Sequence, residues 1–245
     1  MRNIKIVIEY DGKNFAGWQT QPGEESVQGE IERALKEITG EDIELIGSGR
    51  TDAGVHALGQ VANFHTESNI PIEKFPYALN SKIRNSIVVK SAEEVDERFH
   101  ARYNCKGKTY MYIINNNEFP SALNRFREFH MPNKLDVEKM KDALKYFEGT
   151  HDFKGFQSSG GNKRKTTVRT LTKCELTEED GIIKIELSGD GFLYNMVRII
   201  CGTIVDIGLG KIQVCELQDI IESGDRTRAG KTLPPQGLYL KEVRY

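Results

Sequence analysis

The sequence predicts an α+β protein built from two ferredoxin-like halves with antiparallel-rich sheets. Short segments in which apolar and polar residues alternate are typical of half-buried strands, and longer amphipathic segments between them have the helical period. The order of these segments, β-α-β-β-α-β, occurs twice along the 245 residues. Because this length exceeds the roughly 100 to 200 residues of a common single domain, we expect one half over residues 1–103 and a second over 104–245.

The first half begins with a strand from Ile4 to Tyr10, where isoleucines alternate with other residues. A turn at Asp11-Gly12 ends this strand. Ser26 is a good N-cap and Gly40 a good terminator, so a helix is expected from about Ser26 to Ile38. The later elements of this half are strands at 42–46 and 60–65, a short helix at 72–80 and a strand at 87–91.

The second half repeats the same order. Its expected elements are a strand at 108–114, a helix at 136–147, strands at 168–176 and 182–188, helices at 192–207 and 215–222, and a strand at 237–243. The segment 156–167 is rich in glycine and serine and then basic, which predicts an exposed, mobile loop.

Charge and composition exclude several classes of protein. The 34 Lys and Arg residues against 36 Asp and Glu give a formal net charge of −2, so any polyanion must be bound by a local basic patch. No apolar run approaches the roughly 18 to 20 residues of a membrane span, and the N-terminal residues do not resemble an export signal. We therefore expect a cytoplasmic chain that contacts no membrane. The four cysteines form no C-x-x-C pair, which argues against a zinc knuckle, a redox motif and a disulfide scaffold.

The segment from Gly47 to Gly59 is the most unusual in the chain. It combines four glycines with Arg50, Asp52 and His56 between two expected strands, and such a loop can bring its backbone close to a ligand. It matches neither a Rossmann fingerprint nor a P-loop. A carboxylate beside a guanidinium is ionised at neutral pH, which suits Asp52 as a nucleophile or base, although an Asp in a turn is also a common structural cap.

A second glycine-rich turn, at 188–191, is expected to open a helix that carries Tyr194 and Arg198 on one face. Most other residues of that helix are apolar. An arginine in such a helix needs an anionic partner, either a carboxylate such as Asp52 or a phosphate, unless it extends to the solvent.

Two further segments are basic. In the first, from Arg98 to Tyr112, basic residues alternate with aromatic ones, and Tyr110 and Tyr112 are expected to share one face of a strand, where they can form a stacking surface or pack in the core. The second, from Phe153 to Cys174, contains no acidic residue and carries six cations: Lys154, Lys163, Arg164, Lys165, Arg169 and Lys173. This pattern is expected for contacts with a phosphate backbone, and a solvated surface loop is the alternative.

Six motifs that span the chain in order resemble the TruA family of tRNA pseudouridine synthases. They are Glu9 to Gln19, Gly49 to Ala57, Lys108 to Tyr112, Gly149 to Phe153, Gly191 to Arg198 and Gly237 to Leu240. The resemblance implies isomerisation of uridine to pseudouridine at positions 38, 39 and 40 of the tRNA anticodon stem-loop. It also implies a homodimer that needs no cofactor and no metal.

By the same motif match, Asp52 resembles the catalytic aspartate and Arg50 an arginine that helps to extrude the target nucleotide. Tyr110 resembles the tyrosine that stacks on it, and Arg198 the partner of the aspartate. We expect a cleft between the halves, lined by these residues, with the basic residues Lys163, Arg164, Lys165 and Arg169 holding tRNA at its rim.

The sequence leaves the mechanism open. An ionised Asp52 can attack C1′, add to C6 of uracil or assist departure of the base. A non-catalytic RNA-binding module is the main rival, because ferredoxin-like sheets with exposed aromatic residues also bind single strands. Such a binding module would gain no affinity from the Asp52 carboxylate, which lies where phosphates would bind. A phosphohydrolase is disfavoured because Asp52 has no neighbouring carboxylate in the sequence to bind a metal.

Overall fold

The computed structural model describes residues 1–160 and 166–245, which divide into two compact units. The first comprises Met1–Lys106 together with Tyr239–Tyr245, and the second comprises Gly107–Leu238. Both contain helices and strands that pair mostly in the antiparallel sense, so the predicted α+β class is confirmed.

The sheet of the first unit has the strand order of a ferredoxin-like half. β1 lies between β4 and β3, antiparallel to both, and β2 pairs with the outer side of β3. The elements are β1 (Arg2–Tyr10), α1 (Val27–Thr39), β2 (Ile46–Gly47), β3 (His56–Thr66), α2 (Phe75–Asn80), β4 (Ile87–Val95) and β10 (Leu238–Arg244), with short 3-10 helices at Gly12–Asn14 and Ile72–Lys74.

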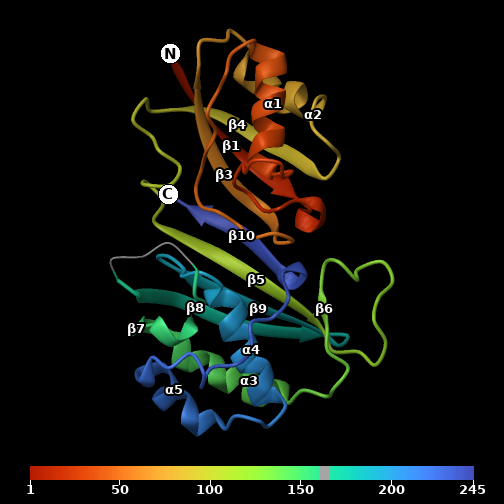
Figure 1. Ribbon diagram of the computed structural model, residues 1–245, viewed down its shortest axis with the longest axis vertical. Coiled ribbons are helices and arrows are strands. Elements are labelled where there is room, and N and C mark those ends of the chain that lie inside the picture. Colours follow the sequence, from red (N-terminus) through yellow and green to blue (C-terminus); the bar gives the residue numbers. More distant parts are fainter. Residues whose placement is uncertain (161–165) are drawn as a thin grey trace. The chain divides into compact units, whose positions relative to one another are not determined.

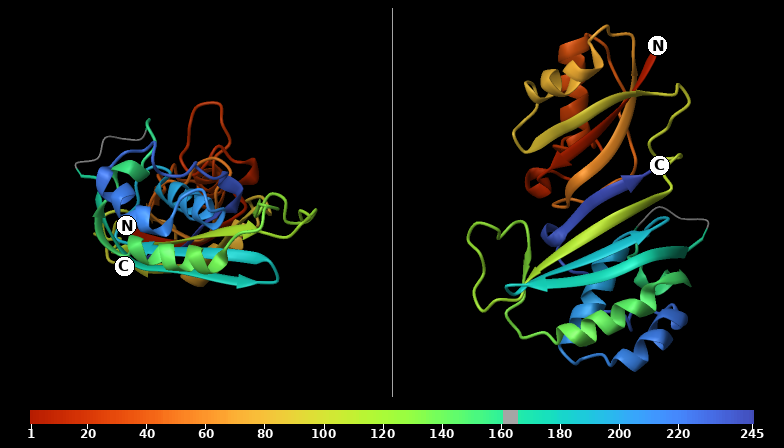
Figure 2. Two further views of the ribbon diagram at one scale, coloured as in Figure 1. Left: turned by 90° about the horizontal axis from the view of Figure 1, so that it is seen from below. Right: turned by 180° about the vertical axis from the view of Figure 1, so that it is seen from behind.

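The core of the first unit lies between this sheet and its helices, which cover one face of it (Figures 1 and 2). Ile4, Ile6 and Ile8 of β1 are fully buried, as the alternation predicts. Helix α1 begins where Ser26 Oγ accepts the Gly29 N–H at 3.1 Å, and it ends at Gly40, whose φ of 79° is left-handed.

The second unit contains an antiparallel sheet in the order β5–β9–β8–β7, with β6 parallel to β5. Its strands are β5 (Gly107–Asn115), β6 (Phe129–His130), β7 (Gly149–Asp152), β8 (Val168–Glu179) and β9 (Ile182–Gly189). Its helices are α3 (Val137–Leu144), α4 (Met196–Gly208) and α5 (Leu217–Ser223), with 3-10 turns at Lys145–Phe147, Lys154–Phe156, Val214–Glu216 and Pro235–Gly237.

Helix α4 is the buried centre of this unit. It packs against α3, and Ile199, Ile200 and Ile204 are fully buried. A Cβ on Gly202 would lie 1.8 Å from the carbonyl oxygen of Lys231, so only glycine lets the chain pass this close to the helix.

Several predicted elements differ from the structure. The strand expected at 42–46 is reduced to Ile46–Gly47, and the helix expected from Phe192 begins at Met196 because Asn195 has a left-handed φ of 60°. The last strand, β10, pairs in parallel with the start of β3 and so belongs to the first unit. No helix in the described part of the chain is both long and apolar enough to cross a membrane.

Candidate active site

Asp52 lies in the loop that joins β2 to β3, and side chains of β3 fix the beginning of this loop. Ser48 donates its N–H to Val61 O at 2.8 Å and its hydroxyl to Gln60 Oε1 at 2.7 Å. The Gln60 amide in turn donates to Gly49 O at 3.0 Å. Since Ser48 and Gln60 are buried, these bonds are shielded from water and hold the backbone that leads to Asp52.

The segment that follows β1 packs directly against this loop. The Trp18 N–H donates to Thr51 O at 3.0 Å. A Cβ on Gly17 would lie 2.6 Å from the same oxygen, and one on Gly47 would lie 2.5 Å from Trp18 Nε1. Glycine at 17 and 47 is therefore required for the close approach of the two segments.

Thr51, the buried residue before Asp52, is held in place by two hydrogen bonds. Its hydroxyl lies 2.7 Å from the hydroxyl of Tyr10, and both side chains are nearly inaccessible to solvent. Burial raises the pKa of Tyr10 well above its ordinary value, so this phenol stays protonated. The residue immediately before Asp52 is thus held by a backbone bond on one side and a side-chain bond on the other.

Asp52 itself is half-buried at a tight turn, where its carbonyl oxygen accepts the Val55 N–H at 3.1 Å. Arg50 is exposed, and its Nε donates to Gln19 Oε1 at 3.1 Å. Its placement beside the Asp52 carboxylate stays a prediction.

His56 closes the loop and has a structural role that the sequence did not reveal. It is 2 % exposed, its Nδ1 accepts the Gly12 N–H at 3.0 Å, and its ring stacks on Tyr239 with 4.8 Å between centroids. Asp11 Oδ1 lies 3.3 Å from the same nitrogen. Because a nitrogen that accepts an N–H bond carries no proton, we assign a neutral imidazole rather than an ion pair to this contact.

Tyr110 is half-buried in β5 of the second unit, opposite Leu187 of β9. Its ring meets Phe192 edge to face, with 5.0 Å between centroids. Tyr112 is fully buried and donates its hydroxyl to Pro234 O at 2.7 Å, so it is a core residue. Of the two alternatives that the sequence left open, Tyr112 packs in the core, whereas Tyr110 is partly exposed.

Arg198 is held in the first turn of α4 by two neutral oxygens. Its Nε donates to Leu233 O at 2.7 Å, and its Nη1 donates to Asn195 Oδ1 at 2.8 Å. The Asn195 amide also donates to Ser158 Oγ at 3.0 Å. Tyr194 precedes the helix, so the expected i, i+4 face with Arg198 does not form. The left-handed Asn195, rather than Tyr194, orients the guanidinium.

The basic segment is only partly described. Arg169 lies on β8 opposite His151 of β7 and is half-buried. Lys173 pairs with Glu175 at 2.7 Å, which neutralises one of the cations counted from the sequence. The other predicted contacts, Lys163, Arg164 and Lys165, lie outside the described residues.

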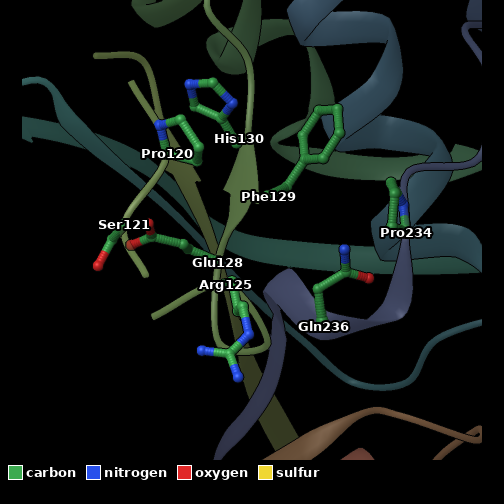
Figure 3. Close-up of a pocket in the computed structure, with 8 residues that line it drawn as sticks. All are labelled: Pro120, Ser121, Arg125, Glu128, Phe129, His130, Pro234 and Gln236. Atoms are coloured by element: carbon green, nitrogen blue, oxygen red, sulfur yellow. The ribbon is translucent and has the colours of Figure 1, made fainter. Parts of the chain in front are cut away.

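A cavity of about 260 Å³ opens in the second unit beside β6 (Figure 3). Its lining residues are Pro120, Ser121, Arg125, Glu128, Phe129, His130, Pro234 and Gln236, none of which the sequence singled out. The volume falls below the roughly 300 to 1,000 Å³ of common small-molecule sites. No group of three or more His, Cys, Asp or Glu side chains within residues 1–160 and 166–245 is placed to hold a metal ion.

Comparison with known proteins supplies the family. The profile of a family described as tRNA pseudouridine synthase matches residues 6–104 and 143–245. Relatives named tRNA pseudouridine synthase A in Acetivibrio thermocellus and Caldicellulosiruptor saccharolyticus are 58% and 54% identical, over 100% of this chain and of their own. The relative named tRNA pseudouridine synthase A 2 in Clostridium perfringens is 53% identical with the same coverage.

A solved structure also resembles the chain at low identity. The crystal structure of the archaeal box H/ACA sRNP Nop10-Cbf5 complex aligns with 97% of this chain and 46% of its own, at 12% identity and a TM-score of 0.36.

Proposed function

The chain belongs to the tRNA pseudouridine synthase family, whose members are isomerases, and on this premise we propose that Asp52 is its catalytic carboxylate. The observation that supports this assignment most is the set of hydrogen bonds that holds the Asp52 turn in place. Thr51 is bound by Tyr10 and Trp18, and Asp52 O accepts the Val55 N–H. Catalytic groups act best when their supports are fixed before substrate arrives.

The reaction is an isomerisation, so the nucleotide has the same composition before and after it. The N1–C1′ bond breaks, the freed uracil turns within the site, and a new bond joins C5 to C1′. C5 then loses its proton and N1 gains one, so no oxidant, reductant or group donor is needed. An ionised carboxylate suits each of three roles: attack on C1′, addition to C6 or support for the departing base.

The remaining site residues act on the substrate around this carboxylate. We assign Arg50 to extrusion of the uridine from the stem-loop, a step that costs a few kcal/mol. Its side chain is exposed and hydrogen-bonded to Gln19. Tyr110 stacks on the extruded base, and its hydroxyl takes part in removing the C5 proton. Arg198, whose guanidinium is oriented by its bonds to Leu233 O and Asn195 Oδ1, is assigned as the partner of the aspartate.

The substrate is the anticodon stem-loop of tRNA, with uridines 38, 39 and 40 as targets. This assignment is supported by the six family motifs, which occur in order along the whole chain. Basic residues of the second unit, Lys163, Arg164, Lys165 and Arg169, hold the phosphate backbone. The enzyme acts in the cytoplasm. It forms a homodimer, and analytical sedimentation of the purified protein tests this oligomeric state.

Release of tritium from tRNA labelled at uridine C5 tests the proposal, because only formation of the C-glycoside frees that label. We expect release by the wild type and none by Asp52→Asn or Asp52→Ala, with tRNA affinity changed only a few-fold. Asp180→Asn is a matched control, since Asp180 is also a turn aspartate and asparagine tolerates its left-handed φ of 51°. Tritium release by Asp52→Ala would exclude a catalytic role for the Asp52 carboxylate. Absence of release by the wild type would favour a non-catalytic RNA-binding module.

A further inference from the structure

A turn at residues 100–104, near the end of the first unit, is rigid by virtue of its own hydrogen bonds. His100 Nδ1 accepts the N–H groups of Arg102 at 3.2 Å and Tyr103 at 3.4 Å. Asn104 Oδ1 accepts the His100 N–H at 2.7 Å, and the Asn104 N–H returns to His100 O at 3.0 Å. This exposed turn therefore holds its side chains in a defined arrangement.

The base of the turn is fixed to the sheet. The buried amide of Asn63 accepts the Ala101 N–H at 2.8 Å, and the Tyr245 hydroxyl donates to Ala101 O at 2.7 Å. Phe99 packs against the ring of Tyr245 with 4.9 Å between centroids. These contacts fix the residues on the N-terminal side of Arg102 and Tyr103, so both project from a firm support.

Tyr103 presents its ring to the solvent. It is 77 % exposed, its ring lies 4.1 Å from that of His100 between centroids, and the Arg102 guanidinium carbon lies 6.0 Å from its centre. A tyrosine this exposed contributes little to a core. An aromatic ring supported by a second ring and flanked by arginine is the arrangement on which proteins stack unpaired bases.

The charges around Tyr103 favour a polyanion. Arg98, Arg102 and Lys106 are exposed, and none of them forms an ion pair within the described residues. The nearby carboxylates on β4 are engaged, because Glu93 pairs with Lys5 and Glu94 with Arg2. Asp96 and Glu97 are also exposed beside the turn, and Asp96 accepts the Arg98 N–H at 2.9 Å.

We propose that Tyr103 stacks on an unpaired base of the tRNA other than the uridine that reacts, while Arg98, Arg102 and Lys106 contact adjacent phosphates. The inference rests on the proposed function, since it assumes that tRNA is the substrate. It adds an RNA contact at the end of the first unit that is separate in the chain from the Asp52 loop and from the basic segment of the second unit.

Tyr77 provides a matched control in the same unit. It is 75 % exposed on α2, and the Lys74 ammonium lies 5.9 Å from its ring centre, so it offers a similar ring and cation. Among the described residues no second ring supports it, and Glu73 is exposed next to Lys74.

The test measures the dissociation constant of unmodified tRNA and kcat/KM for tritium release. Tyr103→Ala is expected to weaken binding about 5- to 100-fold and to lower kcat/KM in proportion. Tyr103→Phe retains the ring and should bind like the wild type, as should Tyr77→Ala. Arg98→Gln with Arg102→Gln should reduce the slope of log K against log salt by about 0.7 for each lost single-strand phosphate contact.

The outcomes separate this inference from the proposed function. Equal affinity of Tyr103→Ala and Tyr77→Ala in an enzyme that releases tritium would overturn the stacking role alone. A loss of kcat/KM in Tyr103→Ala without a loss of affinity would also overturn it. Absence of tritium release from the wild type would instead contradict the proposed function, whatever the affinities.

Discussion

The hydroxyl groups of Tyr10 and Thr51 lie 2.7 Å apart in the core of the first unit. The two residues are 41 positions apart in the sequence. Thr51 is the residue immediately before Asp52. A contact inside the core therefore fixes the start of the turn that presents the candidate catalytic carboxylate at the surface.

Tyr10→Phe should lower the free energy of unfolding by about 1 to 3 kcal/mol, because it leaves the buried Thr51 hydroxyl without this partner. It should also lower kcat for tritium release while tRNA affinity is retained, since the Asp52 turn loses a support. Urea unfolding and single-turnover kinetics measure the two effects.

A double-mutant cycle tests whether the two hydroxyls act as a pair. Thr51→Val removes the second hydroxyl at similar volume. We expect the double variant to be less destabilised than the sum of the single variants, by about 0.5 kcal/mol or more. Strict additivity would mean that the bond contributes nothing.

Tyr110→Phe separates stacking from proton transfer. It keeps the ring that contacts Phe192 and removes only the hydroxyl. If that hydroxyl takes part in removing the C5 proton, single-turnover tritium release at saturating enzyme should slow by on the order of 10² to 10⁴ with normal tRNA binding. Tyr146→Phe, at an exposed position of the second unit, controls for loss of a hydroxyl. Equal rates for the two variants would reduce Tyr110 to a stacking residue.

Replacement of Lys163, Arg164 and Lys165 by glutamine should weaken tRNA binding generally. The slope of log K against log salt should flatten by up to about 0.9 for each duplex phosphate contact that is lost. The triple glutamine variant of Lys139, Lys141 and Lys145 is the control, because each of these lysines on or next to α3 already pairs with an acid three residues away. An identical salt dependence of both variants would contradict the assignment.

The cysteines should differ sharply in alkylation by iodoacetamide at pH 8. Cys215 is exposed and should react first, whereas Cys174 and Cys201 are buried. Burial raises the pKa of the Cys174 thiol to about 12 and raises that of Cys201 as well, so little of the reactive thiolate exists at this pH. Peptide mapping with and without urea measures the rates. Rapid labelling of Cys201 in the native protein would show that α4 opens.

The candidate site illustrates how far residue patterns extend. The glycines, the hydroxyl residues and Asp52 in one short loop made Asp52 a candidate, with a structural cap as the alternative, and the catalytic role was assigned by the family resemblance. The orientation of Arg198 was not predictable, because it depends on a left-handed φ at Asn195 that a helical pattern does not reveal. The different burial of Tyr110 and Tyr112 was not predictable either. Strand alternation places both on one face of β5, but it does not show which part of that face other elements pack against.

The sequence by itself determined the α+β class, the alternating strands such as β1, the capped helix α1 and the family to which the chain belongs. These follow from periodicity, caps and motifs, which act over a few residues. Only the tertiary structure decided that β10 joins β3, where Tyr239 pairs with His56, and that β2 is two residues long. Strand pairing between residues far apart depends on which faces and edges remain available once the core has packed, and local patterns do not contain that information.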